Sequence, residues 1–444
     1  MKTFITLIIK YIKLFLTGFT ILVLVFFTSK IQGQEVMTLK NCYGLAMASS
    51  ALAAEKDAYA EISALKEKNL SKGWLPTLDA NGSFVYNSEV IDMGSALGSL
   101  PLPGIADAIQ PLPHEQYKVN LEINQVIYDG GLIKNSKALE KTDLNINKKQ
   151  IETDLYKLRA QINGYFFSLI LAEKQKEILN NYNNLIIKRI SSVQSGVVNG
   201  VISKSDLYSL SAEKIKTEQQ LSEINIRKSS LLKVLSGLTG KDLDTATKFI
   251  LPELKEENVN VILRPEMELF DLRKEQMAAS LKIIDSRRKP RAFGFATLGY
   301  GNPPGNNFFK DEFDPYYIVG AGLKWNIFDW ERAKNEKQMI TYQQRIIEFR
   351  KKDMTESLIR LLDTKKAEVE SLNSLLESDS ILIYLRKKIT ASAGSQYENG
   401  IITATELLNE MNSEQQALIS FEIHKINLAL AKVEYLNICG EEIK

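Results

Sequence analysis

The sequence predicts a mainly α-helical protein with a small β part, in which long coiled-coil helical hairpins adjoin four amphipathic strands. Three observations predict this fold class: two long proline-free stretches with coiled-coil spacing, four segments of alternating polarity, and landmarks that repeat at a constant offset. Each half of the chain is expected to run helix, strand, strand, very long helix, turn and return helix.

The first residues, 1–33, are expected to form a removable signal peptide. Lysines precede an apolar run from Leu14 to about Phe27, and small residues near Gly33 close the segment. The run is short for a transmembrane helix, which needs ~20 apolar residues, so a retained anchor is the weaker alternative. The remainder is expected to be exported, and to be soluble or to meet a membrane through β-strands.

Charge and cysteine content narrow the possible partners. Removing residues 1–33 deletes four lysines and no acids, which lowers the basic count from 56 to 52 against 54 acidic residues. A net charge near −2 gives no reason to expect nucleic acid. Cys42 and Cys439 remain; an exported compartment permits a disulfide between them, and two buried unbridged thiols are the alternative.

The prolines mark where very long helices can form. All 11 prolines lie from Pro76 to Pro315, and none lies between Pro113 and Pro252. A proline inside a helix costs ~3 kcal/mol, so the clear stretches predict long helices at 131–195 and 331–394 and return helices at 204–236 and 403–438. The residues from 132 to 196 alone would form a rod about 98 Å long at ~1.5 Å per residue.

Apolar residues recur in both stretches at the three- and four-residue spacing of a coiled coil. They are Ile151, Leu155, Leu158, Ile162, Phe166 and Leu169 in the first stretch, and Met354, Leu358, Leu361, Val369, Leu372 and Leu376 in the second.

Four segments with a period of two are expected to be strands, at about 77–88, 116–128, 291–301 and 316–328. Each has an apolar, aromatic-rich face and a face that is mainly polar or glycine. Such strands are typical of membrane barrels, although a half-buried soluble sheet would alternate in the same way. The connections within each strand pair, at 88–115 and 301–315, are rich in Gly and Pro and suit an exposed end.

The two halves are related by an internal repeat of 200 residues. Matching landmarks differ by that number (329 − 129, 400 − 200 and 440 − 240), and they are Asp129 with Asp329, Gly200 with Gly400, and Gly240 with Gly440. The repeats are expected at 34–240 and 264–440, with an inter-repeat linker at 241–263 and a C-terminal tail at 441–444.

Four strands cannot close a barrel, and open edges in lipid leave backbone groups without hydrogen-bond partners. Copies of the chain must therefore share a barrel, of 8 strands for two copies or 12 for three, and strand counting does not choose between them. Rods of about 98 Å that continue from barrel strands must project away from the membrane. Bundled around the same axis, they would extend the pore as a tube.

Short motifs enter and leave the expected strands in a characteristic order. They are Trp74-Leu75-Pro76-Thr77-Leu78, Ile127-Tyr128-Asp129-Gly130-Gly131, Arg264-Pro265-Glu266 and Asn326-Ile327-Phe328-Asp329. On these motifs the chain resembles the TolC-like outer-membrane efflux proteins over essentially its whole mature length. The resemblance implies a homotrimer in outer-membrane lipid, with a shared 12-stranded barrel and a large periplasmic α-barrel. It also implies two further partners, a periplasmic adaptor protein and, through it, an inner-membrane transporter.

The strand-to-helix corners are one group of candidate site residues. They are Asp129, Gly130 and Gly131 in the first repeat and Asp329 in the second. Trp330-Glu331 stands where the first repeat has its two glycines, so the two corners are expected to differ.

The tips of the helical hairpins are a second group, since the resemblance implies that they contact the adaptor. The candidate residues are Gly200, Val201, Ile202, Gly400, Ile401 and Ile402. The family pattern of Gly followed six residues later by an acid occurs twice, with Asp206 and with Glu406. The alternative is that these segments are hairpin turns and nothing more.

The resemblance further implies a constriction at this end of the tunnel. Tyr397 and Glu406 match the family's Tyr and first Asp, Asp206 is the acid of the other hairpin, and Ile402 and Asn409 replace an Arg and a second Asp. In a trimer Glu406 would form a ring of three carboxylates that favours cations. The alternative is an acid that stabilises a helix start.

No catalytic residue, cofactor site or metal site is expected. His114 and His424 are the only histidines, and no CxxC, HExxH, GxSxG or phosphate-binding glycine motif occurs. The predicted function is the outer-membrane exit duct of a tripartite efflux pump or type I secretion system. The alternative is an exported coiled-coil structural or adaptor protein of the envelope without a pore.

Overall fold

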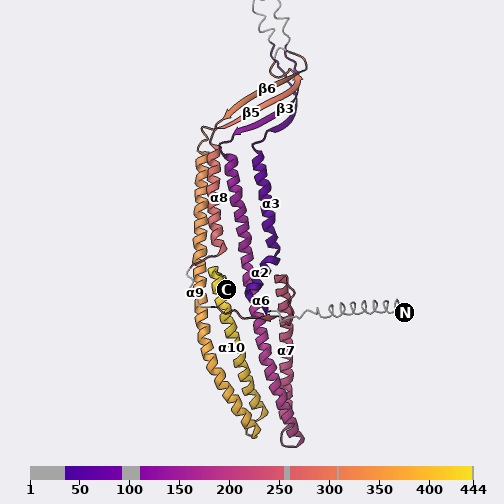
Figure 1. Cartoon of the computed structure of the whole chain (residues 1–444), viewed down its shortest axis with the longest axis vertical. Helices are drawn as coiled ribbons and strands as arrows, with labels where there is room; N and C mark the ends of the chain where they lie inside the picture. Colours follow the sequence, from indigo (N-terminus) through magenta and orange to yellow (C-terminus); the bar gives the residue numbers. More distant parts are fainter. Residues whose placement is uncertain (1–35, 93–110, 255–260, 308–309, 443–444) are drawn as a thin grey trace, which may run out of the picture.

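The structure, a computed structural model, describes residues 36–92, 111–254, 261–307 and 310–442. The expected signal peptide, the outer parts of both strand-pair loops, part of the linker and residues 443–444 lie outside the described residues. The described part is a long bundle of helices with one curved sheet at its end (Figure 1). It is mainly helical with two very long helices, as the sequence predicts.

The two repeats contain matching elements in the same order. The first contains β1 (Val36–Met37), α2 (Leu39–Ser49), α3 (Ala51–Lys72), β2 (Thr77–Tyr86), β3 (Glu115–Tyr128), α6 (Leu132–Val198) and α7 (Lys204–Thr239). After β4 (Lys248–Phe249), the second contains α8 (Pro265–Arg287), β5 (Arg291–Asn302), β6 (Asp314–Lys324), α9 (Arg332–Glu398) and α10 (Ala404–Cys439).

The long helices α6 and α9 run the whole length of the bundle. The helices α3 and α8 lie beside them near the sheet, and α7 and α10 lie beside them in the far half (Figure 1). The stripe predicted on α6 is the buried face of that helix, with Ile162, Phe166 and Leu169 almost inaccessible. No helix in the described part of the chain has an apolar stretch long enough to cross a bilayer.

The single helix expected before the first strand is interrupted at Ser50. This residue is extended (φ −66°, ψ 132°), ends α2, and caps α3 by accepting a hydrogen bond from the Leu52 backbone N–H. A serine side chain can bond nearby backbone groups and so favours such a cap over a helix interior. The break lets α2 pack into the core of the bundle while α3 continues toward the sheet.

The sheet is antiparallel with the strand order β2-β3-β5-β6, so β2 and β6 are its edges. Its register places apolar residues on one face, where Leu78, Ile123, Ala296 and Val319 form one row across the strands. The next row, on the opposite face, is Asp79, Glu122, Thr297 and Ile318.

The fourth strand is shorter than the sequence predicts. It was expected at 316–328, whereas β6 spans Asp314–Lys324. The reason is its partner: Lys324 pairs with Arg291, which is the first residue of β5. The residues after Lys324 extend past the end of β5 and have no strand to bond within the described sheet.

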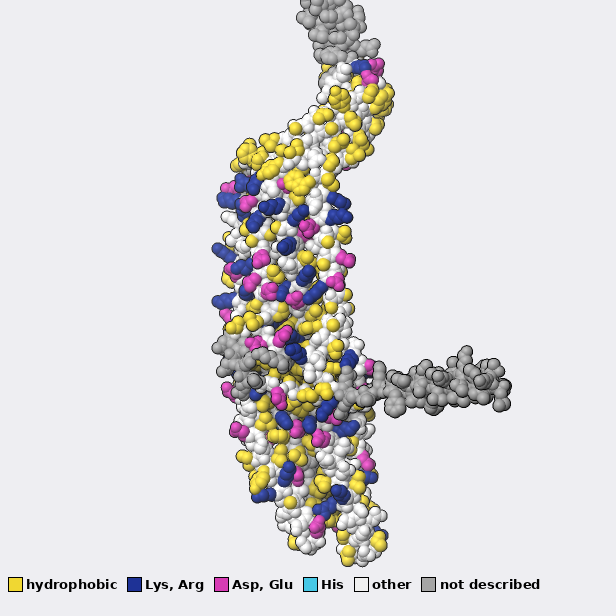
Figure 2. Space-filling view, viewed as in Figure 1, with side chains coloured by type: hydrophobic (Ala, Val, Ile, Leu, Met, Phe, Trp, Pro, Cys, Tyr) yellow, Lys and Arg dark blue, Asp and Glu magenta, His cyan; other side chains and the backbone are white. Residues whose placement is uncertain are grey.

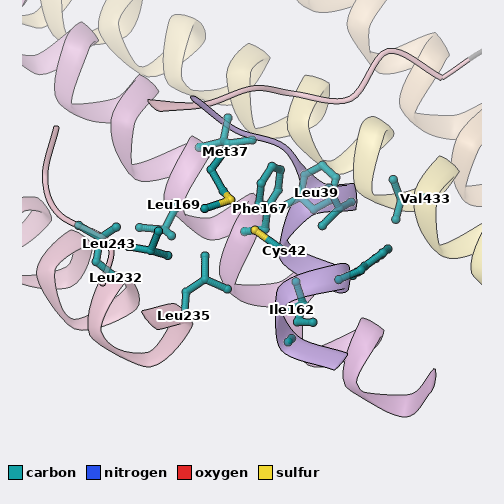
Figure 3. Close-up of a cluster of buried hydrophobic side chains, with 14 of the residues drawn as sticks. Met37, Leu39, Cys42, Ile162, Phe167, Leu169, Leu232, Leu235, Leu243 and Val433 are labelled. Carbon is teal, nitrogen blue, oxygen red and sulfur yellow. The ribbon is translucent and has the colours of Figure 1, made fainter. Parts of the chain in front are cut away.

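The largest hydrophobic cluster of the described residues (Figure 3) lies midway along the bundle, where α2 and the ends of α7 and α10 meet (Figure 1). Met37 and Leu39 from the N-terminal segment pack there against α6, Leu235 of α7 and Val433 of α10. The short parallel pair of β1 with β4 attaches the N-terminal segment to the linker. Gly240 and Gly440 end the return helices in left-handed conformations at this level.

A polar network lies beside this core and connects α2, α6 and α10. The Tyr43 hydroxyl donates to Asn163 and accepts from Asn437 Nδ2 at 3.1 Å, while the Tyr156 hydroxyl donates to the Asn437 carbonyl at 2.5 Å. The Arg159 guanidinium lies over both tyrosine rings, 5.1 Å and 4.4 Å from their centres. Helices α2 and α10, near the two ends of the described part of the chain, are therefore joined to α6 by directional bonds as well as by apolar contact.

Cys42 and Cys439 are buried and form no disulfide. Burial raises the pKa of the Cys42 thiol to about 12 and is also the main cause of a raised pKa at Cys439.

Alkylation requires the thiolate, so the folded protein should resist iodoacetamide at mildly alkaline pH and react at both cysteines after denaturation. Mass spectrometry measures this. Labelling that appears only after denaturation with a reductant would instead reveal a bridge.

Candidate functional site

The candidate residues lie at opposite ends of the molecule. The tip and constriction candidates are at the end of the bundle far from the sheet, and the corner candidates are where the sheet joins the helices (Figure 1).

Both hairpin tips have the same backbone geometry. Each long helix ends at an asparagine cap, followed by Gly200 or Gly400 with φ of 74° or 71°. A Cβ added at either glycine would meet no atom within 4 Å among the described residues, so glycine is needed for its conformation and not for space. Ser203 and Thr403 then cap the return helices.

Each tip presents one aliphatic side chain to solvent and buries part of the next. Val201 and Ile401 are 78% and 69% exposed. Ile202 and Ile402 are half-buried and pack against the apolar clusters between the hairpins. The half-buried isoleucine therefore attaches each tip to the apolar clusters, and the exposed aliphatic residue before it remains accessible to a binding partner.

The constriction candidates Tyr397 and Asp206 lie where the two hairpins meet. The Ala404 backbone N–H donates to Asp206 Oδ1 at 3.4 Å, which joins the start of α10 to the start of α7. The buried Tyr397 hydroxyl has no hydrogen-bond partner among the described residues. Burial raises the pKa of Tyr397, the Asp206 carboxylate raises it further and Arg189 lowers it. The hydroxyl therefore remains protonated.

An ion pair that sequence reasoning missed also joins the hairpins near their tips. Arg189 Nη1 on α6 lies 2.6 Å from Glu398 Oε1 on α9. The Arg189 guanidinium passes close to Gly394, where an added Cβ would lie 3.1 Å from its Nη2. Gly394 follows Arg189 by 205 residues, so no local pattern in the sequence indicates this contact.

Glu406 and Asn409 are exposed on the first turns of α10. Glu406 forms a capping box with Thr403, accepting from the Thr403 backbone N–H at 2.8 Å and from its hydroxyl at 3.0 Å. These hydrogen bonds, the backbone bond first, lower the pKa of Glu406. Its carboxylate is therefore held ionised at the helix start.

The first corner depends on Asp129, whose side chain is buried. Its carboxylate accepts from the Gly131 backbone N–H at 2.7 Å and the Ile133 N–H at 2.6 Å, which caps α6. Gly130 and Gly131 are both left-handed, with φ of 72° and 86°. A Cβ on Gly130 would lie 2.8 Å from Lys289 Cβ, so the corner also leaves no space for a side chain.

The second corner differs from the first in its residues and in the earlier end of its strand, while the two residues after its aspartate are left-handed like Gly130 and Gly131. Trp330 and Glu331 are left-handed, with φ of 52° and 61°, and Asp329 Oδ2 accepts from the Ala333 N–H at 3.0 Å. Left-handed non-glycine residues store of order 1–3 kcal/mol of strain each. The side chains fit because they project outward: Trp330 is 84% exposed.

Within the described ranges, no group of three or more His, Cys, Asp and Glu side chains could hold a metal ion. The four acids of the tips and corners accept hydrogen bonds from backbone N–H groups at helix starts, which suits positioning of helices; they are Asp129, Asp206, Asp329 and Glu406.

Comparison with known proteins identifies the fold. No family profile matches the sequence, and no curated protein matches it. The Campylobacter jejuni CmeC outer membrane channel is 14% identical with a TM-score of 0.63, over 90% of this chain and 85% of that one. The outer membrane protein VceC of Vibrio cholerae is 12% identical with a TM-score of 0.65, over 91% and 97%.

A third solved structure, the open state of the Neisseria gonorrhoeae MtrE outer membrane channel, is 16% identical with a TM-score of 0.64, over 91% and 89% of the two chains. At these identities the likeness establishes the fold. The chain has the TolC-like channel fold, and it spans nearly the whole length of the structures it matches.

Substitution at the first corner tests its geometry. Gly130→Ala should destabilise the protein by about 2 kcal/mol or more, because the added Cβ meets Lys289 and must adopt a left-handed φ. Gly164→Ala is the matched control: it lies inside α6 with open space around it and should stabilise the helix by ~0.5–1 kcal/mol. Thermal loss of the helical circular dichroism signal measures both variants. Equal effects would show that neither the Lys289 contact nor the left-handed φ constrains Gly130.

Proposed function

We propose that the protein is an outer-membrane channel that serves as the exit duct of a tripartite efflux pump or type I secretion system. The observation that supports this most directly is the sheet: it has two open edges, and its apolar face is largely exposed, with Val319 74% accessible. An exposed apolar face of this extent is unfavourable in water and suits lipid. The open edges then require neighbouring copies.

Three copies would close a 12-stranded barrel by joining β6 of one subunit to β2 of the next. The TolC-like fold supports this number over two. The sheet's polar face would line the pore, and the bundled helices would continue that pore through the periplasm.

The surface of α9 supports the same assembly. Met339, Tyr342, Ile346 and Phe349 recur at spacings of three and four and are 49–68% exposed. A coiled-coil stripe of this kind is normally covered by another helix. A neighbouring copy around the axis is the partner that the proposed tube provides.

The tips are proposed as the docking surface for a periplasmic adaptor, which would connect the channel to an inner-membrane transporter. Val201 and Ile401 supply the exposed apolar contacts there. The solved structures that share this fold are described as outer membrane channels, which supports this role for the present chain. Opening the far end would separate the hairpins and would break the Arg189–Glu398 and Asp206–Ala404 contacts.

Two adjacent residues of β6 distinguish the channel from a non-channel envelope protein. Val319→Arg places a charge on the apolar face and should destabilise the assembled barrel by about 2–4 kcal/mol per substituted side chain near the bilayer midplane. Ile318→Arg is the matched control, because Ile318 lies on the opposite, pore-lining face. Recovery of the trimer from the outer-membrane fraction is the measurement.

We expect Val319→Arg to lower trimer recovery strongly and Ile318→Arg to preserve it. The unsubstituted protein should also conduct ions after reconstitution in planar bilayers. A monomer in detergent that never conducts, or recovery in the soluble periplasmic fraction, would instead identify a structural envelope protein.

The proposed carboxylate ring is tested by Glu406→Gln. Glutamine retains the capping box and removes the charge, so cation selectivity should fall without loss of assembly. Because the pKa of Glu406 is lowered, selectivity in the unsubstituted channel should persist below the usual Glu range of ~4.3. Reversal potentials in a salt gradient report this, with Glu377→Gln on α9 as the control. Unchanged selectivity in Glu406→Gln would leave the helix cap as the role of this residue.

A further inference from the structure

A cavity of about 640 Å³ lies beside β1 and α2. A second cavity, where the second repeat passes from strand to helix, is lined by an excess of positive side chains. This cavity has a volume of about 290 Å³ and is lined by the end of α8, the α8–β5 connection, the start of β5, the end of β6, the β6–α9 connection and the start of α9. Figure 2 shows Lys and Arg side chains gathered just below the apolar sheet.

Six cations line this cavity, against two acids that are already engaged. Asp329 accepts from the Ala333 N–H, and Glu336 pairs with Arg332 at 3.0 Å. The other five cations have no carboxylate within 4.0 Å in the described part of the chain; they are Arg287, Arg288, Lys289, Arg291 and Lys324. Unpaired like charges around one cavity repel each other, and a bound anion relieves that repulsion.

The sheet register shows which side of the molecule this cavity faces. Arg291 and Lys324 are register partners, and they belong to the same face as Glu122 and Asp79, opposite the apolar face. In the proposed channel this is the pore side, so Arg291 and Lys324 would meet solutes in the lumen and not the lipid chains.

An aromatic surface adjoins the cations on that same face. Phe293 lies across from Gly322, and Phe295 lies across from Gly320, with the two ring centres 6.3 Å apart. A Cβ on either glycine would overlap the facing phenylalanine ring, so the glycines let the rings lie flat against the neighbouring strand. The result is an apolar patch directly beside the unpaired cations.

We propose that this junction is a binding site for amphipathic organic anions in the lumen, namely aromatic carboxylates, sulfonates or phosphates. The cations bind the acidic group and Phe293 and Phe295 contact the ring. The inference rests on the proposed function and names a class of cargo for it.

The test uses the whole protein reconstituted in bilayers of phosphatidylcholine, with naphthalene-2-sulfonate as the probe. Naphthylmethylammonium has a similar ring with the opposite charge, and methanesulfonate has the acidic group without the ring. Naphthalene-2-sulfonate should reduce the channel current at concentrations where the other two do not. Equal block by the naphthyl cation and anion would overturn the proposal.

Paired substitutions locate the site. Arg291→Gln with Lys324→Gln should raise the half-blocking concentration at least ten-fold. Lys68→Gln with Lys72→Gln is the control, because it removes the same charge from exposed positions on α3 near the sheet. Phe293→Ala should weaken block by naphthalene-2-sulfonate and leave the effect of methanesulfonate unchanged. Equal loss of block in both double variants would overturn the assignment.

Calorimetric titration of the detergent-solubilised protein with naphthalene-2-sulfonate separates this inference from the proposed function. Binding without any ion current would support the anion site and contradict the channel. Current without binding or block would support the channel and overturn the site. Co-purified anionic lipid that is lost in Arg291→Gln with Lys324→Gln, with no effect on block, would assign the cations to lipid headgroups and overturn the proposal.

Discussion

The architecture depends on backbone hydrogen bonding at the edges of one small sheet. Four antiparallel strands satisfy one another inside the sheet, but β2 and β6 each leave one row of N–H and C=O groups open. Water can satisfy such groups, whereas lipid cannot. A sheet that combines open edges with an apolar face can therefore be stable in a membrane only as part of a larger closed structure. The number of strands in one chain then limits how many copies could close such a structure.

The helices transmit that geometry over the length of the bundle. Asp129 directly follows β3 and Asp329 lies five residues after the end of β6, and each caps its long helix by accepting from a backbone N–H of the first helical turn, so the direction of each rod is set at its corner. Midway along, apolar packing and the Tyr43–Asn163–Asn437 network hold the ends of both repeats together. Two separate sets of contacts thus position the far half of the bundle relative to the sheet. One set is the aspartate caps at the strand-to-helix corners, and the other is the core midway along the bundle.

Much of this fold follows from local periodicity. Proline-free heptads predict α6 and α9, and alternation predicts four strands, because both patterns report which face of an element is buried. The break at Ser50 and the end of β6 at Lys324 depend on a cap and on a partner strand, which periodicity does not report. The left-handed Trp330–Glu331 corner contradicts residue preference outright. The contact of Arg189 with Glu398 joins positions far apart in the chain, so single-sequence patterns contain no sign of it.

The matched lengths of the two repeats have a consequence for how such a chain can change. The helices α6 and α9 each have 67 residues, and α7 and α10 each have 36, so both tips reach the same level. Inserting one heptad into each of the two helices of a single hairpin would push its tip about 10 Å past the other at ~1.5 Å per residue. The contacts between the tips would then fall out of phase. Lengthening of the bundle therefore requires paired insertions of the same size, which couples the evolution of positions 200 residues apart.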